Sequence, residues 1–146
     1  MRITYKGDYA LKTILDLSLH YGNGPVFIHD LAERADIPEK FLEQILLDLK
    51  RGGFVESRRG KVGGYLLARP PAQIKLGEVV RFIEGPTEPI ACTEKDYSGC
   101  KDKYKCVFRG IWQEISRATS QIIDNITFED LRRKTEVPGS SFVYQI

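Results

Sequence analysis

The sequence of 146 residues has no long apolar run, little net charge and few residues that bind metals or form disulfides. No stretch approaches the roughly 20 apolar residues that a membrane-spanning helix requires. The first residues, MRITYKGD, lack the apolar segment of a secretory signal peptide. We therefore expect a cytoplasmic protein with no membrane partner. The net charge of +2 is too small to indicate a nucleic-acid partner by itself.

Sequence patterns of common catalytic sites are also missing. The chain has no G-x-S-x-G nucleophile elbow, no G-x-x-x-x-G-K-[ST] phosphate loop and no G-x-G-x-x-G dinucleotide fingerprint. The glycine-rich stretch 60–64 lacks the phosphate-loop spacing, and a cysteine nucleophile would need His20 or His29 as its base. We therefore predict that the protein is not an enzyme.

The composition is that of a globular protein, with 42% hydrophobic and 29% charged residues. The length predicts one domain, or one small domain with an accessory helix, and such a chain buries an ordinary core without disulfides. The charge is unevenly distributed. Residues 51–69 carry five cations against the single acid Glu56. The basic stretch is therefore a candidate for contact with an anionic partner.

The N-terminal half predicts three helices followed by a hairpin. Apolar periodicity and turn residues place helices and then strands over residues 9–21, 28–35, 38–52, 54–58 and 65–68. Asp36 and Ile37 form a tight turn into Pro38, which suits the first position of a helix. Phe41, Leu42, Ile45, Leu46 and Leu49 form the apolar face that follows. This order predicts a winged helix-turn-helix domain over residues 1–70 in a mainly α fold with a small β-hairpin.

The third helix and the hairpin carry the candidate DNA-binding residues. Polar side chains on the outward helix face suit base edges in a major groove, and arginine or lysine on a glycine-rich hairpin suits phosphates or a narrow minor groove. The alternative is a solvated helix face beside a basic loop. The ordered motif favours DNA, with Lys40, Glu43, Gln44, Arg51, Arg58, Arg59 and Lys61 as the contacting residues.

The C-terminal half, residues 71–146, predicts a cysteine loop and a long helix. A short helix over 76–85 precedes an aperiodic loop at about 86–106. The long helix at about 107–126 has an apolar seam formed by Ile111, Ile115, Ala118, Ile122 and Ile126. Such a seam is most simply buried against a second copy of the chain, which predicts a homodimer. Thr127 and Asp130 resemble a capping box and start a last short helix.

The three cysteines lie together in the pattern C-x(7)-C-x(5)-C at Cys92, Cys100 and Cys106. Clustered thiols in a cytoplasmic chain favour metal or redox chemistry, and nearby lysines favour the thiolate form that binds iron. Structural zinc is the rival, although its usual C-x(2)-C pairs are missing. Three ordinary thiols are the remaining alternative. The nearby acids Glu94 and Asp96, or an acid from elsewhere in the chain, are candidates for a fourth ligand.

Several short motifs carry a family resemblance. Leu42-Glu43-Gln44, Arg59-Gly60, Gly63-Gly64-Tyr65-Leu66 and Gly77-Glu78-Val79 resemble, in this order and spacing, the Rrf2 family of winged-helix regulators that includes IscR, NsrR and CymR. The resemblance runs from about residue 1 to residue 135. It implies a recognition helix at 38–52, a wing at 54–68 and a dimerisation helix at 107–126. It also implies that homodimers bind pseudo-palindromic double-stranded operators.

The resemblance further implies an iron-sulfur cluster. Family members with three loop cysteines bind such a cluster, so Cys92, Cys100 and Cys106 match as ligands. Arg109 stands where IscR-type proteins typically have a ligating histidine. NsrR-like proteins instead use an aspartate contributed by the other subunit, and Asp8 stands at that position as the fourth ligand. The analogy with IscR favours 2Fe-2S, and 4Fe-4S also suits these ligands.

We therefore expect a DNA-binding transcriptional repressor that senses iron-sulfur cluster status and controls cluster-assembly genes. One alternative is a CymR-like regulator of cysteine and sulfur metabolism that responds through a protein partner. The C-terminal residues Phe142 to Ile146 resemble CymR-like endings. The other alternative is an NsrR-like repressor that senses nitric oxide.

Overall fold

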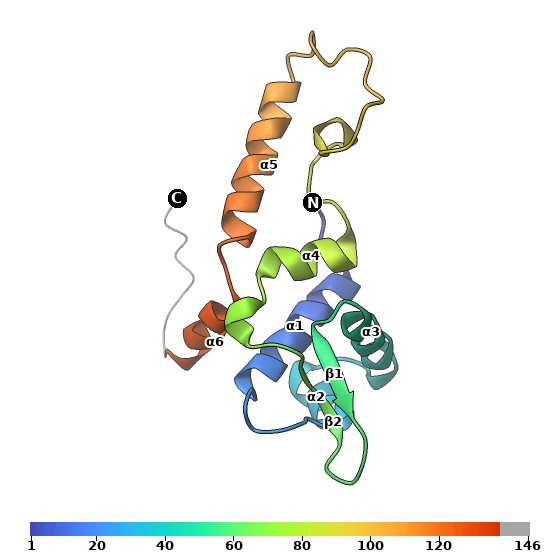
Figure 1. Ribbon diagram of the computed structural model, residues 1–146, viewed down its shortest axis with the longest axis vertical. Helices are drawn as coiled ribbons and strands as arrows, with labels where there is room; N and C mark the ends of the chain where they lie inside the picture. Colours follow the sequence, from blue (N-terminus) through green and yellow to red (C-terminus); the bar gives the residue numbers. More distant parts are fainter. Residues whose placement is uncertain (138–146) are drawn as a thin grey trace.

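The computed structural model describes residues 1–137, and the C-terminal segment that resembles CymR-like endings lies outside them. Helices dominate, and one antiparallel hairpin lies beside the N-terminal helices (Figure 1). This is the mainly α, winged-helix fold that the sequence predicts. The elements are α1 (Tyr5–Leu19), α2 (Ile28–Ala35), α3 (Glu39–Arg51), β1 (Val55–Arg58), β2 (Gly64–Leu67), η1 (Pro71–Gln73), α4 (Leu76–Glu84), η2 (Ala91–Thr93), α5 (Arg109–Ile123) and α6 (Phe128–Glu136).

The helix-turn-helix consists of α2 and α3 packed against α1. Asp36 caps α2 in the left-handed conformation, with φ 53°, which aspartate tolerates better than most residues. The backbone N–H of the next residue, Ile37, donates to Ala32 O at 3.0 Å, and its side chain is buried. Pro38 is the N-cap of α3 and not its first helical residue, a one-position correction. These contacts fix the direction in which α3 leaves the turn.

Two further expectations about these helices are wrong in detail. Helix α1 begins at Tyr5, four residues before the predicted start, because the Thr4 side chain accepts a hydrogen bond from Gly7 N and caps it. Phe41 is 65% exposed although the apolar pattern placed it in the core. Its neighbour Leu42 is fully buried, so Phe41 lies beyond the edge of the buried stripe.

The wing is attached to the rest of the domain by its second strand. Val55 pairs with Leu67 and Arg58 pairs with Gly64, in agreement with the predicted hairpin. Tyr65 also exchanges two backbone hydrogen bonds of 2.8 Å with Val26, in the segment before α2. A Cβ on Gly64 would overlap Val26 O, so glycine permits this close approach. The wing is therefore held at both its base and its side.

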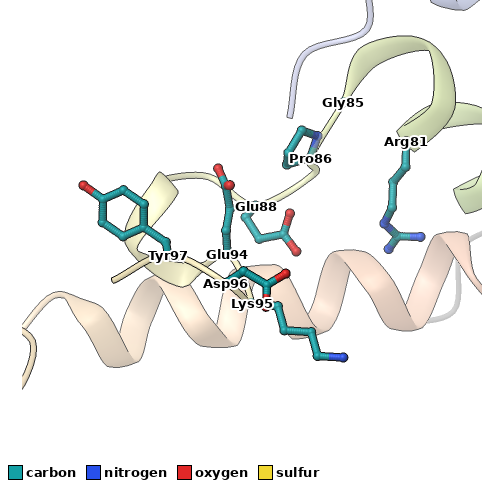
Figure 2. A pocket seen from close by; sticks show the side chains of 8 residues that line it. All are labelled: Arg81, Gly85, Pro86, Glu88, Glu94, Lys95, Asp96 and Tyr97. Atoms are coloured by element: carbon teal, nitrogen blue, oxygen red, sulfur yellow. The ribbon is translucent and has the colours of Figure 1, made fainter. Parts of the chain in front are cut away.

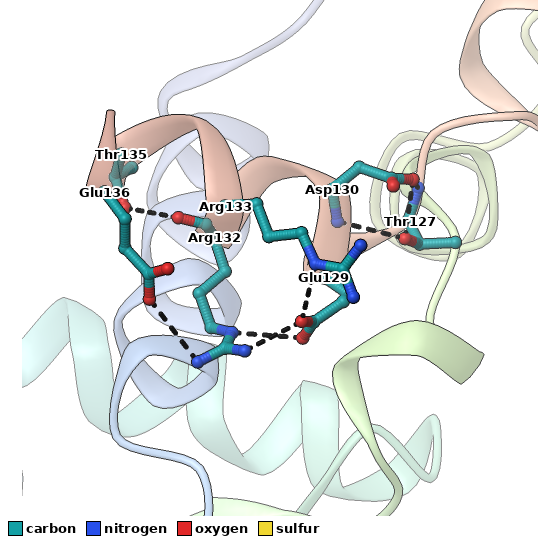
Figure 3. A network of polar contacts seen from close by, with 7 residues as sticks. All are labelled: Thr127, Glu129, Asp130, Arg132, Arg133, Thr135 and Glu136. Atoms are coloured by element: carbon teal, nitrogen blue, oxygen red, sulfur yellow. Dashed lines mark hydrogen bonds and ion pairs between the residues drawn. The ribbon is translucent and has the colours of Figure 1, made fainter. Parts of the chain in front are cut away.

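The C-terminal elements flank α1 and then leave the core. Helices α4 and α6 pack against α1, and one buried cluster contains Ile74, Val79 and Phe128 together with the winged-helix residues. The predicted capping box is confirmed, because Thr127 Oγ1 accepts from Asp130 N while Asp130 accepts from Thr127 N (Figure 3). The same helix carries ion pairs from Arg132 and Arg133 to Glu129. These ion pairs lie within α6 and support its helical conformation.

Helix α5 projects away from the winged helix, and the loop between α4 and α5 lies near its far end (Figure 1). Helix α5 contacts α4 and η2. Ile111, Ile115 and Ile122 of the predicted seam are 52%, 42% and 50% exposed. The loop itself has no regular structure other than η2, as predicted. Among residues 1–137, no helix is long and apolar enough to cross a membrane.

Candidate nucleic-acid interface and cysteine loop

Helix α3 has one buried face and one face open to solvent. Leu42, Ile45, Leu46 and Leu49 are at most 2% exposed and pack in the core. The four predicted DNA-contacting residues of this helix, Lys40, Glu43, Gln44 and Arg51, are all exposed. They belong to the opposite side of the same helix, which has the width to enter a major groove. Leu47 shares this side and is 50% exposed, so an apolar residue omitted by the sequence analysis joins the candidate surface.

The three predicted wing residues, Arg58, Arg59 and Lys61, are also exposed. They lie in or beside a tight turn. A Cβ on Gly63 would overlap Arg58 O and come within 2.9 Å of Arg59 C, so the turn requires glycine there. Lys50 Nζ donates to Ser57 Oγ at 2.7 Å and connects the end of α3 to β1. Helix α3 and the basic wing are therefore joined by a side-chain hydrogen bond.

Asp48 connects α3 to the N-terminal end of α1, which the sequence analysis missed. Its Oδ2 is 2.7 Å from Lys6 Nζ, and its Oδ1 lies 3.4 Å from both Gln44 Nε2 and Arg51 Nη2. The Asp48 side chain is only 13% exposed. The hydrogen bond from Lys6 lowers the pKa of Asp48 below its ordinary value. The carboxylate is thus ionised and surrounded by donors. The i, i+4 spacing of Gln44 and Asp48 was the available sequence signal.

The three cysteines lie on the loop as free thiols. Cys92 and Cys100 are half-buried and Cys106 is exposed. Within residues 1–137, no group of three His, Cys, Asp or Glu side chains is close enough to hold a metal ion. The structure therefore does not bring the predicted ligands together in one protomer. The thiols fit an iron-sulfur cluster in ligand type and would supply three of its four protein ligands, since all three lie on one loop whose regular structure is limited to η2, which contains Cys92.

The predicted fourth-ligand candidates are separated in the structure. Asp8 lies in the first turn of α1 and pairs with Lys12 at 2.8 Å. Glu94 and Asp96 instead line a cavity of about 550 Å³ beside the loop. Figure 2 shows this cavity between the η2 region and Arg81, with Tyr97 at the end farthest from that arginine. The remaining lining residues are Gly85, Pro86, Glu88 and Lys95.

Arg81, which also lines this cavity, joins α4 to the end of α5. Its Nη1 is 2.6 Å from Asp124 Oδ1, and its Nη2 donates to Asp124 Oδ2 and Ser120 Oγ, both at 3.1 Å. The hydrogen bond with Asp124 raises the pKa of Arg81 above its already high ordinary value. A Cβ on Gly77 would overlap Asp124 Oδ1 and lie 2.8 Å from Arg81 Nη1. We call the Arg81, Asp124 and Ser120 contacts the α4–α5 clamp.

A second link joins α4 to the start of α1. Glu84 Oε1 accepts hydrogen bonds from Thr4 N and Thr4 Oγ1, both at 2.8 Å. A Cβ on Gly7 would overlap Glu84 Oε1, so the glycine leaves room for the carboxylate. Helix α4, which packs against α1 and precedes the cysteine loop, is therefore linked to the start of α1 through Glu84 and to the end of α5 through Arg81.

The family and the relatives that match this chain in sequence are all described as transcriptional regulators. The family described as Rrf2, iron-dependent transcriptional regulator, matches residues 3–134. The HTH-type transcriptional regulator IscR of Cronobacter sakazakii is 36% identical over 137 residues, which is 94% of this chain and 83% of the relative. The IscR of Xenorhabdus nematophila is 35% identical, covering 94% of this chain and 82% of the relative.

Two solved structures share the fold over nearly their whole length. The structure of T. potens IscR has a TM-score of 0.76 and 32% identity, and the match covers 99% of this chain and 95% of that one. CymR, described as the global cysteine regulator of B. subtilis, has a TM-score of 0.75 and 32% identity, with 91% and 97% covered. The named relatives are transcriptional regulators and not enzymes.

Proposed function

The chain belongs to the Rrf2 family and is a DNA-binding transcriptional regulator of the IscR type, and from this premise we propose that it is a repressor that responds to an iron-sulfur cluster. Its targets in this proposal are the genes of cluster assembly, and it acts in the cytoplasm, where its operators are. The observation that carries the proposal is the combination of three free thiols on one loop with the links that the preceding helix, α4, makes to the start of α1 and to the end of α5.

DNA binding uses helix α3 and the basic wing together. In this proposal α3 enters the major groove and the wing contacts phosphates or the adjacent minor groove. The exposed outward face of α3 and the tight glycine turn of the wing support these roles. The contacting residues are Lys40, Glu43, Gln44, Arg51, Arg58, Arg59 and Lys61.

A homodimer on a pseudo-palindromic operator provides the geometry for two recognition helices. The exposed isoleucines of α5 support it, because a helix that projects from the core with this much apolar surface needs a partner. A two-fold axis along α5 would bury the same seam on both protomers. The resulting half-sites are about one helical turn, or a multiple of one turn, apart. We also propose residues 1–70 as the DNA-binding domain and residues 71–146 as the regulatory part.

Cys92, Cys100 and Cys106 would hold the cluster, with 2Fe-2S favoured over 4Fe-4S. Asp8 of the other subunit is our proposed fourth ligand, and Glu94 and Asp96 are the alternatives within the loop. When bound, such a cluster supplies a thiolate-ligated iron centre that oxidation or nitric oxide alters. The three thiols are each at least partly accessible, which supports this assignment because an incoming cluster must reach them.

The links of α4 give the loop a route to the DNA-binding helices. A loop that closes on a ligand constrains both of its ends, Glu84 and Arg109. The α4–α5 clamp holds the two flanking helices together, and Glu84 holds α4 to Thr4 at the start of α1. Helix α1 packs against α3. In this proposal, ordering of the cysteine loop changes the position of α5 relative to α3. It therefore changes the spacing of the two recognition helices in the dimer.

A CymR-like role is the second candidate. The likeness to CymR supports it, and the exposed loop offers a surface for a protein partner in place of a cluster. In this alternative the protein regulates cysteine or sulfur metabolism and its thiols are not ligands. An NsrR-like response to nitric oxide is a variant of the first candidate, supported by the place of Asp8 in the first turn of α1.

The test is the visible absorption spectrum of anaerobically purified protein, with iron, sulfide and zinc analysis. Charge-transfer bands with iron and sulfide, lost when all three cysteines are replaced by alanine, are the expected result. The proposal also requires that protein with the cluster and protein without it differ in their affinity for the operator. Protein that stays colourless after anaerobic reconstitution refutes cluster sensing and favours the CymR-like role. Protein that contains zinc but no sulfide refutes the iron-sulfur cluster, and it also refutes the alternative in which the thiols are not ligands.

A further inference from the structure

Asp48 is an acid on a helix whose exposed face we assign to DNA, yet its side chain is only 13% exposed. It contacts two of the proposed DNA-contacting residues, Gln44 and Arg51, and it pairs with Lys6 of α1. A carboxylate in this place would repel phosphates if it faced the DNA directly. Its burial and its contacts instead indicate an action through its neighbours.

We propose that Asp48 is a positioning residue that makes Gln44 select adenine over guanine in the operator. The proposal rests on the function proposed above, because it requires α3 to lie in a major groove. It concerns the amide of Gln44, whose Nε2 lies 3.4 Å from Asp48 Oδ1.

The chemistry of the two groups fixes the orientation of the amide. An ionised carboxylate only accepts hydrogen bonds, so Gln44 must turn its nitrogen and not its oxygen toward Asp48. One N–H is then donated to the carboxylate, and the outward side of the amide presents one N–H and one carbonyl oxygen. Without Asp48 the amide is free to rotate and to present either arrangement.

That outward pattern matches adenine and mismatches guanine. The major-groove edge of adenine offers N7 as an acceptor and N6 as a donor, which pair with the N–H and the oxygen of the glutamine amide. Guanine offers two acceptors, N7 and O6, so the glutamine oxygen would face O6 without a proton between them. The orientation imposed by Asp48 therefore favours A·T over G·C at the pair that Gln44 reads.

Lys6 keeps the carboxylate in place for this role. Its Nζ lies 2.7 Å from Asp48 Oδ2, on the oxygen that Gln44 does not use, and it comes from a different helix. This contact holds the carboxylate against α1 and leaves Oδ1 toward Gln44 and Arg51. The three residues thus form a chain from the first turn of α1 to the proposed base contact.

The experiment uses the full-length protein and an operator selected from random double-stranded DNA. The base pair that Gln44 reads is the one at which Gln44→Ala loses its preference. Affinities for A·T and G·C at this pair are then compared in wild type and Asp48→Ala. We expect about a tenfold preference for A·T in wild type, and about threefold or less in Asp48→Ala. Because each ratio comes from one preparation, a loss of folded protein cancels from it.

Two further variants separate orientation from side-chain shape and stability. Asp48→Asn keeps the shape of the side chain, but with its oxygen toward Lys6 it turns an N–H toward Gln44. It should therefore lose the A·T preference, as Asp48→Ala does. Asp30→Ala removes an exposed acid from α2 and should leave the ratio unchanged. A ratio in Asp48→Ala within twofold of wild type overturns the inference and leaves the proposed function standing, as does a Gln44→Ala variant with unchanged base preferences. Failure to select any operator overturns the proposed function itself, and this inference with it.

Discussion

Gly77→Ala tests whether the α4–α5 clamp contributes to stability. Alanine is the better helix former, so the substitution in α4 should by propensity alone stabilise the protein by about 0.5–1 kcal/mol. The new methyl group would, however, overlap Asp124 Oδ1 and crowd Arg81 Nη1 at 2.8 Å. At this residue the gain in helix propensity therefore opposes the steric overlap with the clamp.

The structure gives the magnitude of each effect. Loss of the clamp costs about 1 kcal/mol, because both side chains are about a third exposed and solvent weakens their attraction. Crowding of a filled site adds about 1–3 kcal/mol. After subtraction of the propensity gain, Gly77→Ala should lower the free energy of unfolding by about 1–3.5 kcal/mol. The measurement is urea unfolding followed by circular dichroism, at equal protomer concentrations.

Gly110→Ala is the matched control, since a Cβ on this glycine of α5 meets nothing within 4 Å. It should raise stability by about 0.5–1 kcal/mol. In an Asp124→Ala background the overlap with Asp124 disappears, and the end of Arg81, no longer held by Asp124, can move away from the new methyl group. Gly77→Ala should then stabilise as well. Equal stabilisation by the two glycine substitutions in the otherwise native protein would refute the clamp as a stabilising contact.

Three other predictions concern the wing, α5 and α6. Arg59→Ala should weaken operator binding and reduce the slope of log affinity against log salt concentration by about one, in titrations at several salt concentrations; an unchanged slope argues against a phosphate contact. Ile115→Glu should convert the proposed dimer to a monomer in analytical ultracentrifugation, because it places a charge in the apolar seam of α5; a dimer that persists places the interface elsewhere. Asp130→Ala should cost about 1 kcal/mol at neutral pH. Hydrogen bonds from Thr127 lower the pKa of Asp130 below its ordinary 3.8, so its contribution is present above that value and is lost as the pH falls through the folded-state pKa. The difference between Asp130→Ala and wild type should therefore shrink below pH 3.8 in acid unfolding curves, and a constant difference contradicts this assignment.

The sequence predicts the elements well where apolar periodicity decides them. Helices α2, α3 and α4 lie within one residue of expectation, because each buries an apolar face. The hairpin also lies within one residue of expectation, because the glycine-rich turn marks its centre. The first turn of α1 was missed because it depends on a cap from Thr4 and not on an apolar period. Phe41 was misplaced because an aromatic residue beside a buried stripe has the same pattern whether it lies inside or outside.

The candidate site was predicted only in part for a similar reason. Residue type and helical face are local properties, so the exposed faces of α3 and the wing follow from the sequence. The contacts of Asp48 with Lys6 and of Arg81 with Asp124 join residues 42 and 43 positions apart, and no local pattern indicates them. The sequence predicts the three thiols as metal ligands. Whether they converge on one metal site depends on the conformation of the cysteine loop, which has little regular structure.

Helix α4 also limits where the chain can change length. Gly77, Arg81 and Glu84 are spaced by four and three residues, so they share one phase of the helix. A single inserted or deleted residue between them would rotate one contact by about 100° relative to the other and break the link to α5 or to α1. The loop from Gly85 to Phe108 has no such phase to preserve. Insertions and deletions among homologues should therefore collect in the loop and avoid the eight positions from Gly77 to Glu84.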